Sequence, residues 1–174
     1  MNKVYIVGLP ASGKTTAGQW LANKMGWTFV DLDNVIEQKA NSSVADIFDL
    51  KGEGHFRILE SEALRETENL ENAVISTGGG TASYEDNMEW MNGMGLTIYL
   101  NTNHEIITER LILENGERPM FTDLKGAEIA DYLRELHDLR KKMYGKSKLV
   151  YNKSDLTNNL YVAVNQLIEV HSEA

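Results

Sequence analysis

The amino-acid sequence contains no cysteine, and only two of its 174 residues are proline. The lack of cysteine excludes disulfide bonds, thiolate metal sites and cysteine nucleophiles. Positive charge is also scarce, because 17 lysines and arginines stand against 26 aspartates and glutamates, giving a formal net charge of −9. Nucleic acids and anionic membranes need a broad basic surface, so we expect neither as a partner. An anionic small substrate would need a few cationic side chains gathered in one cleft.

Long apolar runs are absent as well. No stretch approaches the length that spans a membrane, and the first predicted strand begins so close to Met1 that we expect no signal peptide. The sequence shows no linker, repeat or low-complexity segment, and 174 residues are enough for one domain with a sizeable core. We therefore expect a single domain over residues 1–174, in a cytoplasmic protein that acts as a monomer.

A glycine-rich stretch near the start of the chain is the most informative feature that is present. Residues 8–15, G-L-P-A-S-G-K-T, match the phosphate-binding pattern G-x-x-x-x-G-K-[ST]. The apolar run 4–7 before it predicts a buried parallel strand, and residues 16–25 after it predict a helix. Backbone N–H groups and the helix dipole then favour an anion at the turn, whereas a chance match would lack this context.

This context predicts a site for a nucleoside triphosphate, most simply ATP. Lys14 would reach the β- and γ-phosphates, and the Thr15 hydroxyl would ligate Mg²⁺. The nucleotide-binding residues predicted within the stretch and just after it are Gly8, Ala11, Ser12, Gly13, Lys14, Thr15 and Thr16.

Strand and helix patterns alternate through the rest of the chain. Strands are predicted over residues 4–7, 28–32, 73–76, 96–100 and 148–151, with helical patterns between them and after the last strand. Ser43, with Asp46, and Asn103 are side chains typical of helix starts. The alternation predicts an α/β fold with a five-stranded parallel sheet flanked by helices, in which ligands bind beyond the carboxyl ends of the strands.

Polar residues follow the predicted strands where a second ligand would bind. Asp31 and Asp33 suit contacts to Mg²⁺ and to an acceptor hydroxyl, although Asp33 could instead cap the next helix. Arg57 and Glu60 are spaced to pair on one face of a helix, and a solvated ion pair is the alternative. The glycines at 78–80 offer bare backbone N–H groups to a ligand, and a flexible loop is the alternative.

These motifs occur together in an order and spacing that resemble the shikimate kinase family. The motifs are the phosphate loop, F-x-D-x-D at 29–33, G-E-x-x-F-R-x-x-E at 52–60 and G-G-G at 78–80. R-P-M-F at 118–121 is similar to the family's lid motif, and R-K-K-M-Y at 140–144 to its R-x-x-x-Y segment. The resemblance covers nearly the whole chain. It implies a nucleoside-monophosphate-kinase-like P-loop NTPase fold, with substrate-binding helices at about 33–61 and a mobile lid at about 114–124.

The resemblance implies ATP-dependent phosphorylation of the 3-hydroxyl of shikimate, a step of aromatic amino acid biosynthesis, with Mg²⁺ as cofactor. Asp33 would orient the acceptor hydroxyl and take its proton, and Asp31 would hold Mg²⁺ through water alongside Thr15. Lys14 and Arg118 would neutralise charge on the transferring phosphoryl group, because such transfer depends mainly on positioning and electrostatics.

The resemblance also implies contacts to the rest of both substrates. Arg57 and Arg140 would grip the carboxylate of shikimate, as guanidinium forks suit, and Glu60 would fix the Arg57 side chain. The remaining residues with implied contacts are Gly79 and Gly80, as backbone donors to shikimate, and Arg110, near adenine. A surface ion pair with Glu109 or Glu114 is the alternative for Arg110.

Two other functions remain open at this point. A gluconate-kinase-like enzyme would share the phosphate loop, but the two arginines and the three glycines favour a cyclic carboxylic acid as acceptor. A regulatory module that binds ATP without catalysis would need neither Asp33 nor Arg118.

Ala11 departs from the resembled pattern, where another glycine is usual, and its small side chain is expected to fit.

Overall fold

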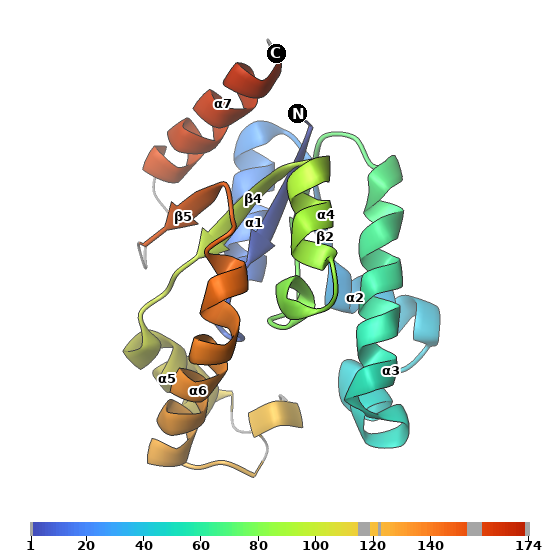
Figure 1. The fold of residues 1–174 in the computed structure, drawn as a ribbon, viewed down its shortest axis with the longest axis vertical. Helices are drawn as coiled ribbons and strands as arrows, with labels where there is room; N and C mark the ends of the chain where they lie inside the picture. Colours follow the sequence, from blue (N-terminus) through green and yellow to red (C-terminus); the bar gives the residue numbers. More distant parts are fainter. Residues whose placement is uncertain (1, 115–118, 122, 153–157, 173–174) are drawn as a thin grey trace.

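A computed structural model describes residues 2–114, 119–121, 123–152 and 158–172 of the chain. Its five strands form one parallel sheet in the order β2-β3-β1-β4-β5. The strands are β1 (Lys3–Val7), β2 (Thr28–Asp31), β3 (Ala73–Ser76), β4 (Leu96–Leu100) and β5 (Leu149–Tyr151). The predicted five-stranded parallel sheet is confirmed, and helices cover both of its faces (Figure 1).

The helices lie where the sequence pattern predicts them. They are α1 (Lys14–Met25), α2 (Leu32–Ala40), α3 (Val44–Glu66), α4 (Asn87–Met94), α5 (His104–Leu113), α6 (Ala127–Tyr144) and α7 (Asn158–Ser172), with short 3₁₀ turns η1 (Thr67–Asn69), η2 (Thr81–Ser83) and η3 (Pro119–Phe121). Both predicted helix starts are confirmed. Ser43 Oγ accepts from the Asp46 N–H at 3.0 Å, and Asn103 Oδ1 accepts from the Glu105 N–H at 2.8 Å.

The central strands β1, β3 and β4 are buried along their whole length because each faces a packed layer on both sides. Along β1, Tyr5 and Val7 point into a core shared with α2, α3, α4, α5 and α6, whereas Val4 and Ile6 point into a second core shared with α1 and α7. Successive strand residues alternate between faces, so a continuous buried run requires two cores. Among the described residues, no helix combines the length and apolarity needed to cross a membrane.

Two local features adjust the predicted elements near the carboxyl end of the sheet. The second strand ends at Asp31 rather than at residue 32, because α2 begins at Leu32 directly after it. Helix α3 is interrupted at Gly52, whose φ of 79° and ψ of 167° are not helical, so a second helical segment, which carries Arg57 and Glu60, follows Gly52. Helices α3 and α6 both contact η2, which follows the three glycines.

A pair of histidines joins α5 to α6. The rings of His104 and His137 meet edge to face with centroids 4.7 Å apart, and His137 Nε2 lies 3.1 Å from the Tyr99 hydroxyl. Partial burial lowers the pKa of His137 below its usual value, and the charges of His104 and Lys141 act in the same direction while that of Asp138 opposes them. The folded state therefore resists protonation of His137 more than the unfolded chain does.

We expect His137 to lower the free energy of unfolding as the pH decreases. Between its lowered folded pKa and about 6.5, the unfolded chain binds more protons at His137, so the free energy of unfolding decreases as pH falls through that window. Urea unfolding at about pH 7.5 and about pH 5.5 should show a larger loss for the wild type than for His137→Gln, which cannot titrate. Equal losses in the two proteins would contradict this assignment.

Candidate active site

The phosphate-loop sequence forms the predicted turn between β1 and α1. Gly8 has φ 152°, and a Cβ placed on it would lie 2.8 Å from the Leu100 carbonyl oxygen, so only glycine fits there. Gly13 caps α1 in the left-handed region with φ 95°. Ala11 also takes a left-handed φ of 55°, the conformation that a glycine would adopt more easily. The turn therefore forms with alanine in place of glycine, as expected.

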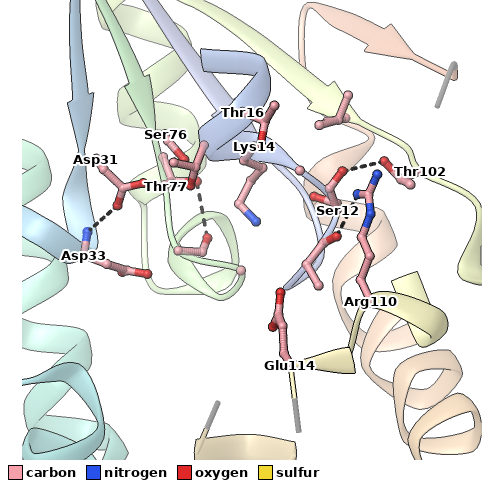
Figure 2. Close-up of a pocket in the computed structure, with 16 residues that line it drawn as sticks. Ser12, Lys14, Thr16, Asp31, Asp33, Ser76, Thr77, Thr102, Arg110 and Glu114 are labelled. Carbon is pink, nitrogen blue, oxygen red and sulfur yellow. Dashed lines mark hydrogen bonds between the residues drawn. The ribbon is translucent and has the colours of Figure 1, made fainter. Parts of the chain in front are cut away.

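Two side chains from the β4–α5 region brace this loop (Figure 2). Thr102 Oγ1 donates to the Ser12 carbonyl at 2.8 Å, and Arg110 Nη1 donates to the Ala11 carbonyl at 3.0 Å. Arg110 also lines the cavity in front of the loop. It is therefore part of the loop's support. The sequence offered no direct signal for Thr102, because its partner is 90 residues away in the chain.

Lys14 lies inside the loop rather than on the surface. Its side chain is only 8% exposed, and Nζ donates to the Leu9 carbonyl at 2.8 Å. Figure 2 shows the side chain lying between the Asp31–Asp33 pair on one side and Arg110 on the other. A cation held at the floor of a helix N-terminus is well suited to meet phosphate oxygens.

The two aspartates have different local roles. Asp31 is the N-cap of α2, since its Oδ1 accepts from the Asp33 N–H at 3.1 Å, while its Oδ2 accepts from Thr15 Oγ1 at 2.8 Å. Asp33 lies in the first turn of α2, so the alternative that Asp33 is the cap is wrong. Asp31 is the last residue of β2 and Asp33 belongs to α2, yet both carboxylates line the same cavity.

The Thr15 hydroxyl and the Asp31 carboxylate have the chemistry to hold Mg²⁺. Both are oxygen ligands, they lie together beside the phosphate loop, and they already share a hydrogen bond. Within the described ranges, no three His, Cys, Asp or Glu side chains gather as a metal site. One or two protein oxygens are the usual contribution to Mg²⁺ when substrate phosphates and water supply the other ligands.

Two adjoining cavities meet at Asp33. The first, of about 370 Å³, is lined by the phosphate loop, Ser76, Thr77, Thr102 and Arg110. The second, of about 610 Å³, is lined by Arg57, Glu60, Gly80 and Arg140. The residues that line both cavities are Thr15, Asp31, Asp33, Gly78, Gly79 and Glu114. A carboxylate at the boundary can therefore contact groups on both sides.

Arg57 and Glu60 form a buried pair at the edge of the second cavity. Arg57 is 8% exposed and Glu60 is fully buried, with Nη1 and Oε2 2.7 Å apart. Glu53 accepts from Arg57 Nε and Nη2 at 3.2 and 2.9 Å. Burial opposes the charge of Arg57, but the two carboxylates outweigh it and raise its pKa. The alternative of a solvated ion pair is therefore wrong. Glu53 lies four residues before Arg57, the spacing of a helical ion pair, so the sequence also carries a signal for this second partner.

The three glycines are packed closely against side chains from distant segments. A Cβ on Gly78 would overlap the Glu60 carboxylate, and one on Gly80 would overlap the Arg57 guanidinium. A Cβ on Gly79 would lie 2.7 Å from Pro10 Cδ. These contacts argue against a flexible loop. They also show why glycine is needed at these positions: a Cβ would collide with the neighbouring side chains. This reason adds to the predicted access of a ligand to backbone N–H groups.

Arg140 and Tyr144 reach the same turn from α6. Arg140 is 8% exposed, lines the second cavity, and its Nη1 is buried without a hydrogen-bond partner among the described residues. Tyr144 is fully buried and donates to the Gly79 carbonyl. The structure thus brings Arg57 and Arg140 to one cavity, although 83 residues separate them in the sequence.

Some predicted site residues lie outside the described residues. Arg118 belongs to this group, as do residues 115–117 and 122 of the predicted lid, 114–124. The described part of the lid segment includes Met120 and Phe121, which line the second cavity, and Phe121 packs edge to face on Tyr132 with centroids 5.4 Å apart.

Comparison with known proteins decides the family. The family model for shikimate kinase matches residues 10–171. This chain belongs to the shikimate kinase family. The shikimate kinase of Parabacteroides distasonis is 40% identical over 135 residues, which cover 78% of each chain. A solved shikimate kinase from Bacteroides thetaiotaomicron superposes with a TM-score of 0.86 at 32% identity, covering 98% of both chains.

A second solved family member contains bound shikimate. The shikimate kinase of Acinetobacter baumannii, in complex with shikimate, superposes with a TM-score of 0.85 at 29% identity, covering 98% of this chain and 94% of that one. The fold and the resemblance seen in the sequence are therefore confirmed for this chain, including the nucleoside-monophosphate-kinase-like P-loop architecture.

Proposed function

We propose that this chain transfers the γ-phosphoryl group of ATP to the 3-hydroxyl of shikimate, giving shikimate 3-phosphate and ADP in aromatic amino acid biosynthesis. The observation that carries the proposal is the pair of adjoining cavities with Asp33 between them. One cavity has the chemistry for a triphosphate and the other has two arginines for a carboxylate. A kinase must hold two substrates with their reacting atoms in line, and this arrangement provides for that.

On the ATP side, the loop N–H groups and Lys14 would hold the β- and γ-phosphates. Mg²⁺ at Thr15 and Asp31, when bound, would neutralise phosphate charge. Arg110 supports the loop through the Ala11 carbonyl, so its side chain fixes the nucleotide site even before any contact to adenine. Arg118 is proposed, from the family resemblance, as a further cation on the phosphoryl group.

On the acceptor side, Arg57 and Arg140 would bind the carboxylate of shikimate. Arg57 is fixed by Glu53 and Glu60, so its remaining N–H groups are already oriented. The buried Nη1 of Arg140 supports an anionic ligand, because a buried donor is costly unless a partner satisfies it. Backbone N–H groups of the glycine turn would complete the contacts.

The transfer itself requires one proton acceptor. The acceptor hydroxyl oxygen would bond to the γ-phosphorus as the bond from that phosphorus to the β–γ bridging oxygen breaks, and the hydroxyl proton would pass to the Asp33 carboxylate. Asp33 lies at the boundary of the two cavities, where the hydroxyl and the γ-phosphate must meet. Positioning and electrostatic stabilisation by the surrounding cations would supply most of the rate enhancement.

The two alternatives fit less well. Gluconate also carries a carboxylate, but a family match over residues 10–171 supports shikimate. A module that only bound ATP would gain nothing from a second cavity with two buried arginines and a carboxylate at the boundary. A cytoplasmic location and a monomeric state remain predictions, and light scattering of the purified protein tests the second.

Replacing Arg140 by alanine is expected to raise KM for shikimate about ten- to a hundredfold with little change in kcat. The carboxylate is remote from the reacting hydroxyl, so ground and transition states lose the same contact. Arg57→Ala should have a similar effect, but it also leaves the buried Glu60 without its cation, so its folding must be checked. Arg134→Ala, an exposed arginine on the same helix, is the matched control.

A double cycle that combines Arg140→Ala with the methyl ester of shikimate tests whether this arginine binds the carboxylate. The methyl ester of shikimate should bind the wild type as poorly as shikimate binds Arg140→Ala, and the variant should lose little more with the ester. Additive penalties for the ester and for Arg140→Ala would show that Arg140 does not hold the carboxylate. The acceptor site would then have to be placed elsewhere, even if shikimate proved to be the substrate.

A further inference from the structure

A side chain of α6, Tyr144, is hydrogen-bonded to the glycine turn after β3. Tyr144 is fully buried, and its hydroxyl donates to the Gly79 carbonyl oxygen at 2.5 Å. Its ring stacks on Tyr99 with centroids 5.0 Å apart and 24° between the planes. Burial raises the pKa of Tyr144, so the hydroxyl stays protonated and remains a donor, while the neighbouring Arg140 acts on it in the opposite direction.

The bonded carbonyl belongs to the same peptide group as the Gly80 N–H. In a trans peptide the C=O and the N–H point in opposite directions, and none of the described peptide bonds is cis. A bond that fixes the Gly79 carbonyl toward Tyr144 therefore fixes the Gly80 N–H away from it. Gly79 and Gly80 both line the acceptor cavity, so this N–H is a candidate donor there.

Such a peptide needs an anchor because glycine lies on both of its sides. A flip of the peptide plane changes ψ of Gly79 and φ of Gly80, and glycine tolerates both signs of φ. Without a fixed carbonyl, the N–H could turn away from the cavity at little cost. A preorganised donor binds a ligand more tightly than one that must first be ordered.

We propose that Tyr144 is a positioning residue for the acceptor: its hydroxyl fixes the Gly79–Gly80 peptide plane and thereby aims the Gly80 N–H at the bound molecule. The proposal rests on the function proposed above. Arg140 lies four residues earlier on α6 and interacts with the same hydroxyl. One helix therefore presents a guanidinium to the acceptor and orders a backbone donor for it.

Tyr5→Phe is a matched control for Tyr144→Phe. Tyr5 is also fully buried, but its hydroxyl bonds to Thr67 Oγ1 at 3.0 Å, away from the turn. Each change removes one buried hydroxyl and keeps the ring, so both variants should lose some stability. A role in positioning predicts that only Tyr144→Phe changes acceptor binding.

The first readout needs no substrate. In protein labelled with ¹⁵N-glycine, the Gly80 amide signal should shift or broaden in Tyr144→Phe and stay unchanged in Tyr5→Phe. With substrates, KM for shikimate should rise about three- to tenfold in Tyr144→Phe, while kcat and KM for ATP stay within about twofold. 3-Fluorotyrosine at position 144, which keeps the hydroxyl, should restore wild-type KM.

Several outcomes would overturn the proposal. One is a wild-type Gly80 signal and wild-type KM for shikimate in Tyr144→Phe. Another is an equal change in every kinetic parameter with the Gly80 signal unmoved, which would indicate general loss of packing. If Tyr144→Phe does not fold, the fluorotyrosine protein still decides, because altering the donor strength must move the Gly80 signal. If the Gly80 signal depends on Tyr144 as predicted but the wild type does not phosphorylate shikimate, the proposed function is refuted and the role of Tyr144 as an anchor still holds.

Discussion

Replacing Lys14 by alanine is expected to lower kcat for phosphoryl transfer by about a hundred- to a thousandfold. The Lys14 side chain enters the cavity from the floor of the phosphate loop, where it would meet charge that develops on the γ-phosphate. Steady-state turnover of ATP with shikimate, followed through ADP release, measures the change. The effect should be in kcat as well as KM, because this charge is greatest in the transition state.

The burial of Lys14 changes how this variant must be controlled. Lys14 is only 8% exposed and bonds to the Leu9 carbonyl, so its removal can also lower stability. Its loss removes one of two hydrogen bonds to that carbonyl, which also accepts from the Ser12 N–H at 3.2 Å, so thermal unfolding should be measured beside activity. Lys24→Ala, an exposed lysine on the same helix, should keep wild-type turnover. Wild-type turnover in a folded Lys14→Ala protein would remove Lys14 from the phosphate site.

Asp33→Asn is expected to reduce kcat about a hundredfold or more, the range for a positioned proton acceptor. Asparagine keeps the shape of the side chain but removes the charge and the basic oxygen. Asp131→Asn is a suitable control, since Asp131 is an exposed carboxylate on α6 that pairs with Arg134. Both variants should bind ATP with wild-type affinity.

The division between kcat and KM decides the role of Asp33. A proton acceptor contributes to the transition state, so its loss must appear in kcat. If kcat held and only KM for shikimate rose, Asp33 would be a binding group and the base would have to be another residue. Its place between the two cavities is compatible with contact to the acceptor in either case.

The elements of the fold could be predicted because their signals are local. The strands 73–76 and 96–100 are short, mostly apolar runs followed by polar residues, and the structure has strands with the same bounds. Ser43 and Asn103 cap helices through bonds that span two or three residues. The phosphate loop is also local, since strand, turn and helix follow one another within about 25 residues.

The details of the site could not be predicted because they depend on distant partners. The sequence predicts that glycines 78–80 expose N–H groups to a ligand, but each glycine also makes room for a side chain from the segments at 10 and 57–60. Whether Arg57 and Glu60 are solvated or buried depends on the turn that covers them, and helical spacing carries no such information. Asp31 rather than Asp33 caps α2, because the strand ends one residue earlier than its apolar pattern indicates.

Tyr144 is another residue whose hydrogen-bond partner could not be predicted from the sequence. In the sequence it is only the last letter of the R-x-x-x-Y segment, and nothing nearby shows what its hydroxyl binds. Its partner is a backbone carbonyl 65 residues away, reached only once α6 packs beside the turn after β3. The roles of individual site residues, unlike the family and the fold, therefore stay predictions until variants are measured.

The most direct test of the account is acceptor specificity. ADP release from ATP should be measured with shikimate, gluconate and nucleoside monophosphates at equal concentrations, with the phosphorylated product identified by mass spectrometry and phosphorus NMR. The account predicts rapid ADP release with shikimate alone and a phosphate on its 3-hydroxyl. Faster release with gluconate or a nucleoside monophosphate, or ATP binding without transfer to any of the three, would contradict it.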